Sequence, residues 1–439
     1  MHFYGYRRRR LAVVLLCCII SILYISHDLY FQRGYWTKAI STGPTNASPD
    51  IRHTVTINEA ASPHREKLPG GVLLVSALFP LKKSKHSMKS YKAWLYNFLQ
   101  ITTPIYIFLP KSLFSLLPQT LPDNLTVNST YDTIFDLPMM KGMEPIYEAN
   151  WLLDPEKDIH GPELYAIWKS KGWLLEEGYK NRDGEWDHIF WVDAGSFRGQ
   201  SFYKHWPDVG RVRDAWAQTD PAAETRIFMP IVRAPYAKHA RWKEEDGPID
   251  QDISMASFFG GTPSAVHWYN SVYIAYHDYW LSKNLFVGKD QNLINALFLL
   301  FPSRFFTVFY DDEDPYAAAH QPYTSIFDQR WWRARWKDWH FAGAYAASRA
   351  LGKCGSECYY YKFFFAAQGE REVAQDHWLG DHDGWDRWPF GTEHGMDRHD
   401  RCRLTKATGF EKLLSRHDRF GPGWTPPTRH LNVTASEYY

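Results

Sequence analysis

From residue 71 onward, short apolar runs alternate with segments of helical periodicity. Continuous apolar runs bounded by turn residues are typical of strands buried in a parallel sheet. These runs cover residues 72–78, 105–109, 189–192, 227–232 and 258–262. Between and after them, apolar residues recur at helical spacing over residues 88–99, 164–178, 266–281 and 293–301. The alternation predicts wound strand–helix units, and hence an α/β fold with a mostly parallel sheet flanked by helices.

The N-terminus has the pattern of a membrane anchor. Four arginines at positions 7–10 precede an apolar run over 11–25, and residues 29–31 extend that run. A membrane-spanning helix needs about 20 apolar residues, so we expect a signal-anchor transmembrane helix over 11–31. The arginines place a tail, residues 1–10, in the cytoplasm. A cleaved signal peptide is the alternative, but no small-x-small cleavage site follows the run, which favours a retained anchor.

The remaining chain divides by composition. Residues 32–70 carry Gly-Pro and Ser-Pro pairs with polar filler and no apolar period, which is typical of a stalk. We expect a catalytic domain over 71–345 and a C-terminal extension over 346–439. A short anchor suits the thinner membranes of the early secretory pathway. The sequence therefore predicts a single-pass type II protein of the Golgi or endoplasmic reticulum membrane, with its C-terminal domain in the lumen.

Charge and cysteine content agree with a lumenal enzyme and argue against a nucleic-acid partner. Lys plus Arg total 50 and Asp plus Glu total 49, so the chain lacks the excess of basic residues that is typical of a nucleic-acid-binding protein. Cys354, Cys358 and Cys402 would meet an oxidising lumen, where either a 354–358 or a 358–402 disulfide is possible. Sequons that predict a glycoprotein in that compartment begin at Asn46, Asn124, Asn128 and Asn432.

The strongest candidate for chemistry follows the apolar run 189–192, which ends at Asp193. In open α/β sheets, ligands bind beyond the carboxyl ends of the strands, so this carboxylate can meet a ligand or a metal on its phosphates. Gly195 lets the backbone turn and approach the ligand closely, and Arg198 is a candidate to neutralise phosphate. The alternative is that Asp193 only caps a turn and Arg198 is an ordinary surface arginine.

Further candidates lie downstream. Asp290 and Gln291 stand at the start of a predicted helix, where side chains and free backbone N–H groups can meet a ligand; alternatively, Asp290 is simply an N-cap. His340 follows a tryptophan-rich segment and is either a metal ligand or a packed residue. Residues 376–402 are dense in Asp and His, which suggests either a metal-dependent hydrolase or a solvated loop.

Taken in order, these features resemble the GT-A glycosyltransferases, Rossmann-like enzymes that use nucleotide sugars, and most closely the HtrL/YibB family. The resemblance covers about residues 71–310. It rests on an opening strand at 72–79, the strand end at 191–195, the glycine pair at 260–261 and the Lys-Asp-Gln element at 289–291.

A more distant resemblance is to the glycogenin-like retaining transferases. In that family a strand ends in Asp-x-Asp, an Asp-Gln-x-x-x-Asn helix follows, and a His-x-x-Gly segment closes the site. Residues 193–195 keep only the first acid, because Gly195 stands in place of the second. Residues 290–295 match the helix, and residues 340–343 match the first half of the closing segment.

The resemblance implies a hexosyltransferase-like protein that moves a sugar from a nucleotide-sugar donor to a glycan or glycoprotein acceptor. It implies that Asp193 and His340 hold Mn²⁺ or Mg²⁺ with the donor phosphates, that Gly195 and Arg198 also contact the donor, and that Asp290 and Gln291 lie beside the donor sugar as catalytic residues. The missing second acid favours an alternative, a non-catalytic carbohydrate-binding or assembly protein on the same scaffold. Retaining and inverting stereochemistry both stay open.

Overall fold

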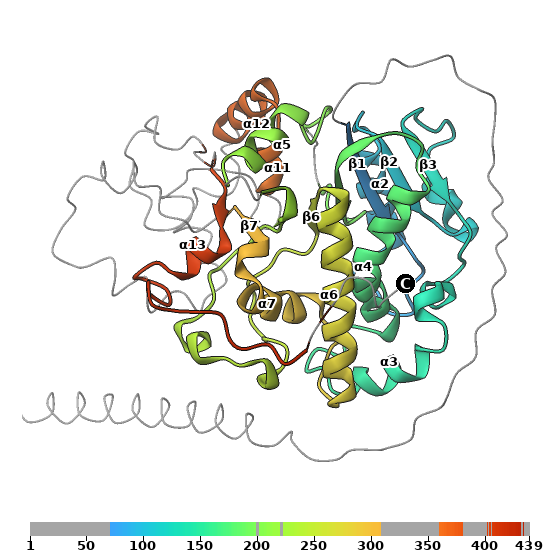
Figure 1. The fold of residues 1–439 in the computed structure, drawn as a ribbon. Helices are drawn as coiled ribbons and strands as arrows, with labels where there is room; N and C mark the ends of the chain where they lie inside the picture. The colour runs from blue at the N-terminus through green and yellow to red at the C-terminus, as the bar shows by residue number, and fades with distance from the viewer. Residues whose placement is uncertain are drawn as a thin grey trace, which may run out of the picture. The chain divides into compact units, whose positions relative to one another are not determined.

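The computed structural model describes residues 71–198, 202–219, 223–308, 360–380, 402, 404, 406–431 and 433. All of them fall in one compact unit of the chain, residues 54–439. The described residues form a mixed α/β structure around an eight-stranded, mostly parallel sheet, as the sequence predicts (Figure 1). The strand order is β3-β2-β1-β4-β6-β5-β7-β8. The strands are β1 (Gly71–Ala77), β2 (Ile105–Phe108), β3 (Leu125–Asn128), β4 (Trp186–Val192), β5 (Ile227–Phe228), β6 (Phe258–Gly261), β7 (Phe305–Thr307) and β8 (Thr408–Gly409).

The first half of the sheet is parallel throughout. β1 lies between β2 and β4, and Leu74 is in register with Ile105 on one side and Phe190 on the other. β3 extends this half as a further parallel strand. Helices cover both faces, so the strands are apolar in continuous runs rather than in alternation.

The second half of the sheet reverses direction at β6, which pairs antiparallel to both β4 and β5. β5 is parallel to β7, and β8 closes the edge antiparallel to β7. A glycine at the reversal has a steric reason, because a Cβ on Gly260 would lie 2.1 Å from the carbonyl oxygen of Ile189. Glycine at this position therefore allows β6 to approach β4.

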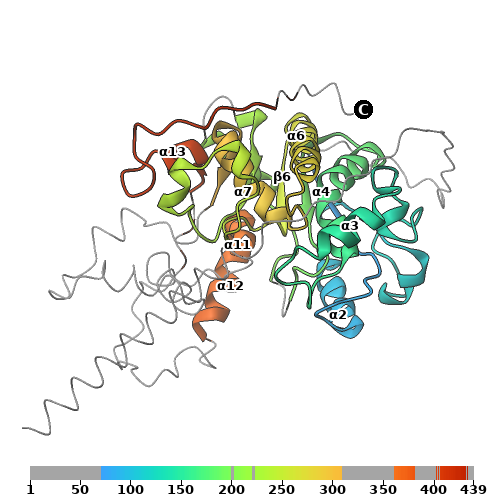
Figure 2. The ribbon, with the colours of Figure 1, turned by 90° about the horizontal axis from the view of Figure 1, so that it is seen from below.

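Two hydrophobic cores lie on opposite faces of the sheet, because alternate strand residues point to opposite sides. Leu73 and Val75 pack with α4, α6 and α7, whereas Val72 and Leu74 pack with α2, α5 and α11. Figure 2 shows α4, α6 and α7 on one side and α2 and α11 on the other. The α-helices are α2 (Met88–Phe98), α3 (Glu144–Trp151), α4 (Pro162–Lys180), α5 (Val209–Ala217), α6 (Pro263–Ser282), α7 (Asp290–Leu300), α11 (Tyr361–Phe365), α12 (Gln368–Gly380) and α13 (Phe410–Leu414). Short 3₁₀ helices are η1 (Lys111–Leu116), η2 (Ile134–Asp136), η3 (Pro138–Met140), η4 (Ala223–Thr225), η5 (Ala237–Arg241), η6 (Glu244–Asp246) and η7 (Pro302–Arg304).

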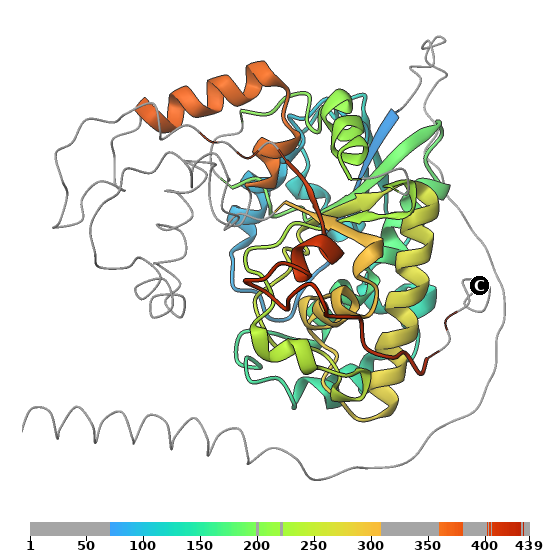
Figure 3. The same ribbon diagram turned by 60° about the vertical axis from the view of Figure 1, so that its left-hand side comes forward.

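Residues beyond 346 contribute to the same cores. α13, drawn red in Figure 3, packs beside β7. The Phe365 ring of α11 lies 4.7 Å from the Phe228 ring in β5, and Phe410 of α13 stacks on Phe298 of α7 at 4.1 Å. β8 adds the last strand of the sheet. The expected C-terminal extension thus supplies part of the domain's core.

Several predicted features fall outside the described residues: the anchor over 11–31, the stalk, His340 and most of the 376–402 segment. Within the described part of the chain, no helix combines the length and the apolar character needed to cross a membrane. Cys402 is disulfide-bonded. The other cysteines lie outside the described residues, so its partner does as well.

Candidate functional site

Asp193 and Asp290 come together on a buried lysine. Asp193 follows the last residue of β4, Asp290 is the first residue of α7, and Lys171 projects from the middle of α4. The Lys171 Nζ atom lies 3.2 Å from Asp193 Oδ1 and 2.9 Å from Asp290 Oδ2, and it donates to the Ala256 carbonyl oxygen at 2.9 Å. Asp290 Oδ2 is buried and accepts no hydrogen bond among the described residues, so its contact with the Lys171 ammonium is an ion pair.

The Asp193 carboxylate is fixed but remains accessible. The indole Nε1 of Trp191 donates to its Oδ1 at 2.6 Å, while Oδ2 lies 3.5 Å from Lys171 Nζ. Its side chain is 36% exposed, compared with 6% for that of Asp290. The backbone N–H of Ser196 donates to the Asp193 carbonyl oxygen, so the residue also starts a turn. The turn is therefore a backbone feature, and the carboxylate is available for other contacts.

Asp290 lies in a less polar environment. Burial raises the pKa of Asp290, and Lys171 only partly offsets that effect. Burial would lower the pKa of Lys171, but Asp193 and Asp290 together raise it. When all three groups are ionised, two negative charges surround one positive charge. The group therefore carries a net negative charge, most exposed at Asp193.

Gln291 is occupied by backbone contacts. Its side-chain Nε2 donates to the Ser254 carbonyl oxygen at 2.6 Å, and its backbone N–H donates to Asp290 Oδ1 at 2.8 Å. Both Gln291 and Asp290 thus take part in holding the start of α7. Their predicted role beside a donor sugar stays a prediction.

The turn after Asp193 packs on an aromatic surface of α2. Arg198 Nε donates to the Gly195 carbonyl oxygen at 3.1 Å, and its guanidinium lies 4.3 Å from the centre of the Trp94 ring. A Cβ on Gly195 would lie 3.4 Å from the same indole, which is an ordinary van der Waals contact. Gly195 and Arg198, both predicted to contact a donor, therefore lie with Trp94 in the turn that follows Asp193.

A second polar cluster could hold a metal ion. Ligand atoms of Asp154, Glu156 and His160 all lie within 4.8 Å of one another. Asp154 Oδ2 already has two partners, with the Tyr165 hydroxyl at 2.5 Å and His160 Nδ1 at 2.8 Å. Glu156 is ion-paired with Lys289, so a cation would have to displace that ammonium. This cluster was not predicted, although its Asp-x-Glu-x-x-x-His spacing is visible in the chain.

Lys171 is the other residue that the sequence analysis did not single out. It occupies a position among the apolar residues of the 164–178 helix face. Lysine is almost never fully buried unless it is paired. A lysine within an apolar stripe was therefore a signal for a buried ion pair, but the sequence does not identify its partners. The metal ligand predicted at His340 lies outside the described residues, so among those described Asp193 is the only member of that predicted pair.

Comparisons of the sequence with models of known protein families and with curated proteins find no match.

Proposed function

We propose that this protein is a glycosyltransferase-like enzyme of the GT-A type, anchored as a single-pass type II protein in the Golgi or endoplasmic reticulum membrane. It transfers a sugar from a nucleotide-sugar donor to a glycan or glycoprotein acceptor. The observation that carries the proposal is the meeting of Asp193 and Asp290 at the end of β4. At that point a parallel strand, β1, flanks β4 on one side and the antiparallel β6 flanks it on the other. Ligand sites in α/β sheets lie at the carboxyl ends of strands.

The chemistry of sugar transfer suits this arrangement. Breaking a sugar–diphosphate bond develops negative charge on the leaving phosphate, which a cation must stabilise. Mn²⁺ or Mg²⁺ would supply that stabilisation, and the exposed Asp193 carboxylate, with His340 as the second predicted ligand, would hold it. The net negative charge of the Asp193–Lys171–Asp290 group suits a cation. Lys171 itself is buried between two carboxylates and a carbonyl oxygen, which keeps its ammonium away from a phosphate.

The ion pairs of Lys171 with both carboxylates favour a second candidate function. If the lysine takes the place that a metal occupies in an active enzyme, the carboxylates are already neutralised in part. Gly195 in place of a second acid agrees with that interpretation. The protein would then be a non-catalytic carbohydrate-binding or assembly protein on the same scaffold.

Donor turnover separates the two candidates. Purified protein is incubated with a panel of nucleotide sugars and Mn²⁺, and release of the nucleoside diphosphate is measured. Asp193→Asn should reduce turnover by about a hundredfold or more, because loss of a catalytic electrostatic contact has that typical cost. Its melting temperature should stay close to that of the wild type. Asp187→Asn is the matched control: Asp187 stands near the other end of β4, with a side chain that is 53% exposed, and its replacement should leave turnover unchanged. Turnover of no donor would favour the binding protein, and full activity in Asp193→Asn would contradict the assigned site.

The predicted topology has its own test. A C-terminal tag should be protected from protease in sealed microsomes and digested once detergent is added. Digestion without detergent would contradict the type II orientation.

A further inference from the structure

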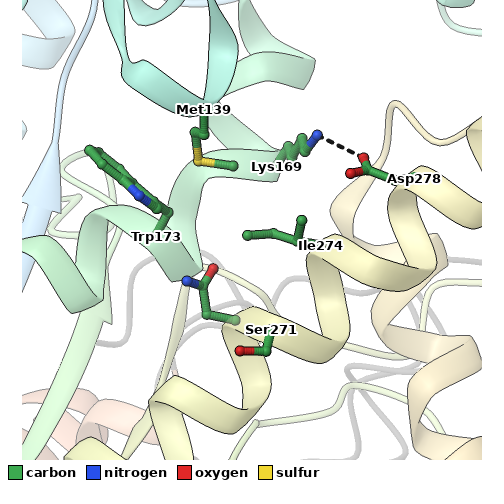
Figure 4. Close-up of a pocket in the computed structure, with 7 residues that line it drawn as sticks. Met139, Lys169, Trp173, Ser271, Ile274 and Asp278 are labelled. Carbon is green, nitrogen blue, oxygen red and sulfur yellow. Dashed lines mark hydrogen bonds and ion pairs between the residues drawn. The ribbon is translucent and has the colours of Figure 1, made fainter. Parts of the chain in front are cut away.

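A cavity of about 250 Å³ lies between α4 and α6, on the helix layer rather than at the carboxyl edge of the sheet (Figure 4). Lys169 and Trp173 reach it from one face of α4. Ser271, Ile274 and Asp278 reach it from one face of α6, at the spacing that aligns side chains along a helix. Met139 of η3 also lines it. The cavity shares no residue with the Asp193–Lys171–Asp290 group.

One part of the cavity wall is apolar. Met139 and Ile274 point toward the same space and Trp173 also lines it, and each of the three is partly buried (Figure 4). Ligand pockets are lined mainly by such side chains, with a few polar groups that fix the orientation of the ligand. An indole and two aliphatic side chains offer a surface for the C–H face of a ring.

The opposite part of the wall presents an aspartate that is held rigidly by its neighbours. Lys169 Nζ lies 3.0 Å from Asp278 Oδ1, and His277 Nδ1 lies 2.7 Å from the same oxygen. On its other side, His277 Nε2 lies 2.8 Å from the Tyr147 hydroxyl. Both partners on this side hold Oδ1, and the Asp278 side chain is 49% exposed. Among the described residues no contact is made to Oδ2, so this oxygen can accept a hydrogen bond from a ligand.

The protonation states of this chain follow from burial. Burial lowers the pKa of His277 to about 4 and raises the pKa of the Tyr147 hydroxyl well above its usual value, so both groups are neutral near pH 7. The Tyr147 hydroxyl then donates to His277 Nε2, and Nδ1–H donates to Asp278. Burial would raise the pKa of Asp278, but the contacts with His277 and Lys169 lower it, so its carboxylate stays ionised.

Charge and size restrict the ligand. The Lys169 ammonium and the Asp278 carboxylate cancel, so the cavity favours neither an anion nor a cation. Its volume lies below the roughly 300–1,000 Å³ of sites for drug-sized ligands, so the occupant has the size of one ring. The occupant must also combine an apolar face with a hydrogen-bond donor for Asp278 Oδ2.

We propose that this cavity is a binding site for a single neutral sugar ring, whose C–H face packs on Trp173 and whose hydroxyl donates to Asp278. The site goes beyond the proposed transfer reaction, because it takes a sugar away from the sheet edge and needs no nucleotide. It would let the protein hold a glycan by one of the glycan's sugar residues.

The test is saturation-transfer NMR on the full-length protein in detergent, with methyl glycosides of glucose, galactose, mannose and N-acetylglucosamine. At least one glycoside should receive saturation at its ring protons. Ile274→Phe fills the cavity from α6 and should abolish that signal, or weaken binding at least tenfold. Met139→Phe fills it from η3 and should do the same, which provides a second variant if the first does not fold. The corresponding reducing sugars are tested in parallel. They represent a free monosaccharide, whereas the methyl glycosides mimic the terminal residue of a glycan, so the comparison distinguishes the two ligands.

Two controls locate the binding. Val373→Phe adds the same ring to an exposed position of α12, where the side chain is 58% exposed, and should leave the signal unchanged. Asp193→Asn should also leave it unchanged, even where it abolishes donor turnover, so failure of the transfer function and failure of this site are distinguishable. The proposal is overturned if no glycoside binds the wild type, if binding survives both cavity-filling variants, or if Asp193→Asn removes it.

Discussion

Two lysines two positions apart on α4 are both nearly buried, yet they form opposite kinds of site. Residues at i and i+2 of a helix do not face the same way, so Lys171 points to the end of β4 and Lys169 points to α6. Lys171 is buried against two aspartates and a carbonyl oxygen. Lys169 contacts one oxygen of Asp278, and the other oxygen of that carboxylate faces a cavity.

The difference shows that burial of a charge does not define its role. Around Lys171 the buried partner, Asp290, gives a closed group that holds three elements together, and only Asp193 extends from it to solvent. Around Lys169 the acid is half exposed and the lysine serves to orient it. Loss of the lysine should therefore cost more stability in the closed group than in the open one, whose acid is available for binding.

Matched substitutions of the two lysines test this contrast most strongly. Lys171→Met leaves Asp290 buried without its counter-ion, and removing one partner of a buried pair typically costs about 3–5 kcal/mol. Lys169→Met leaves an acid that is half exposed and still bonded to His277, so its cost should stay within about 1 kcal/mol. Denaturant unfolding of both variants measures the difference.

Methionine preserves the unbranched shape of lysine in both variants, so each serves as the packing control for the other. Equal losses of stability would contradict the distinction between a closed and an open group. A larger loss in Lys169→Met would reverse it.

The pH dependence of stability provides a second test on the cavity side. The pKa of buried His277 is lowered to about 4 from an ordinary value near 6.5, so the unfolded chain binds a proton between those values and the folded chain does not. Stability from this group is therefore complete above the unfolded pKa and is lost as the pH falls through that window. From pH 7 to pH 5 the expected loss is about 2 kcal/mol.

His277→Gln isolates that contribution, because glutamine can bond Tyr147 and Asp278 but cannot take up a proton in this range. The variant should lose about 2 kcal/mol less than the wild type between pH 7 and pH 5, as measured by urea unfolding at each pH. Parallel pH profiles for the two proteins would show that His277 is not the titrating group.

The two lysine groups could not be predicted from the sequence, although much of the fold around them could. The main strands and helices were predictable, because β1 and β4 are continuous apolar runs and α6 is a long, largely apolar segment. β5 was expected over 227–232 but spans only Ile227–Phe228, and β3 was not predicted, because four partly buried residues at a sheet edge carry little periodicity. β7 and β8 are too short to give a pattern.

The site was predictable only in part, and for a physical reason. Asp193 and Asp290 stand at element ends, which sequence patterns locate. Lys171 and Lys169 lie mid-helix, and the partner of each is set by how α4 packs against β4, α6 and α7. Such pairings join residues about 22 to 119 positions apart, so no local pattern contains them.

Replacing the acid in each group by asparagine should give the smallest changes in stability, and the two changes should differ in direction. The pKa of Asp290 is raised, so its ionised form is disfavoured in the folded protein, and stability falls as the pH rises through that pKa. Asp290→Asn removes a disfavoured charge at pH 7, keeps an oxygen for the Gln291 N–H, and leaves Lys171 paired with Asp193. Its stability should equal or slightly exceed that of the wild type.

The pKa of Asp278 is lowered, so its charge stabilises the fold above the unfolded pKa, and that stability is lost as the pH falls through the folded value. Asp278→Asn should therefore be destabilising at pH 7, by about 1 kcal/mol or less because the group is half exposed. Differential scanning fluorimetry at pH 7 should give melting temperatures that move in opposite directions, or one that stays fixed while the other falls. A destabilised Asp290→Asn beside an unchanged Asp278→Asn would mean that the carboxylate on α7 supports the fold through its charge, and that the open acid on α6 contributes nothing to it.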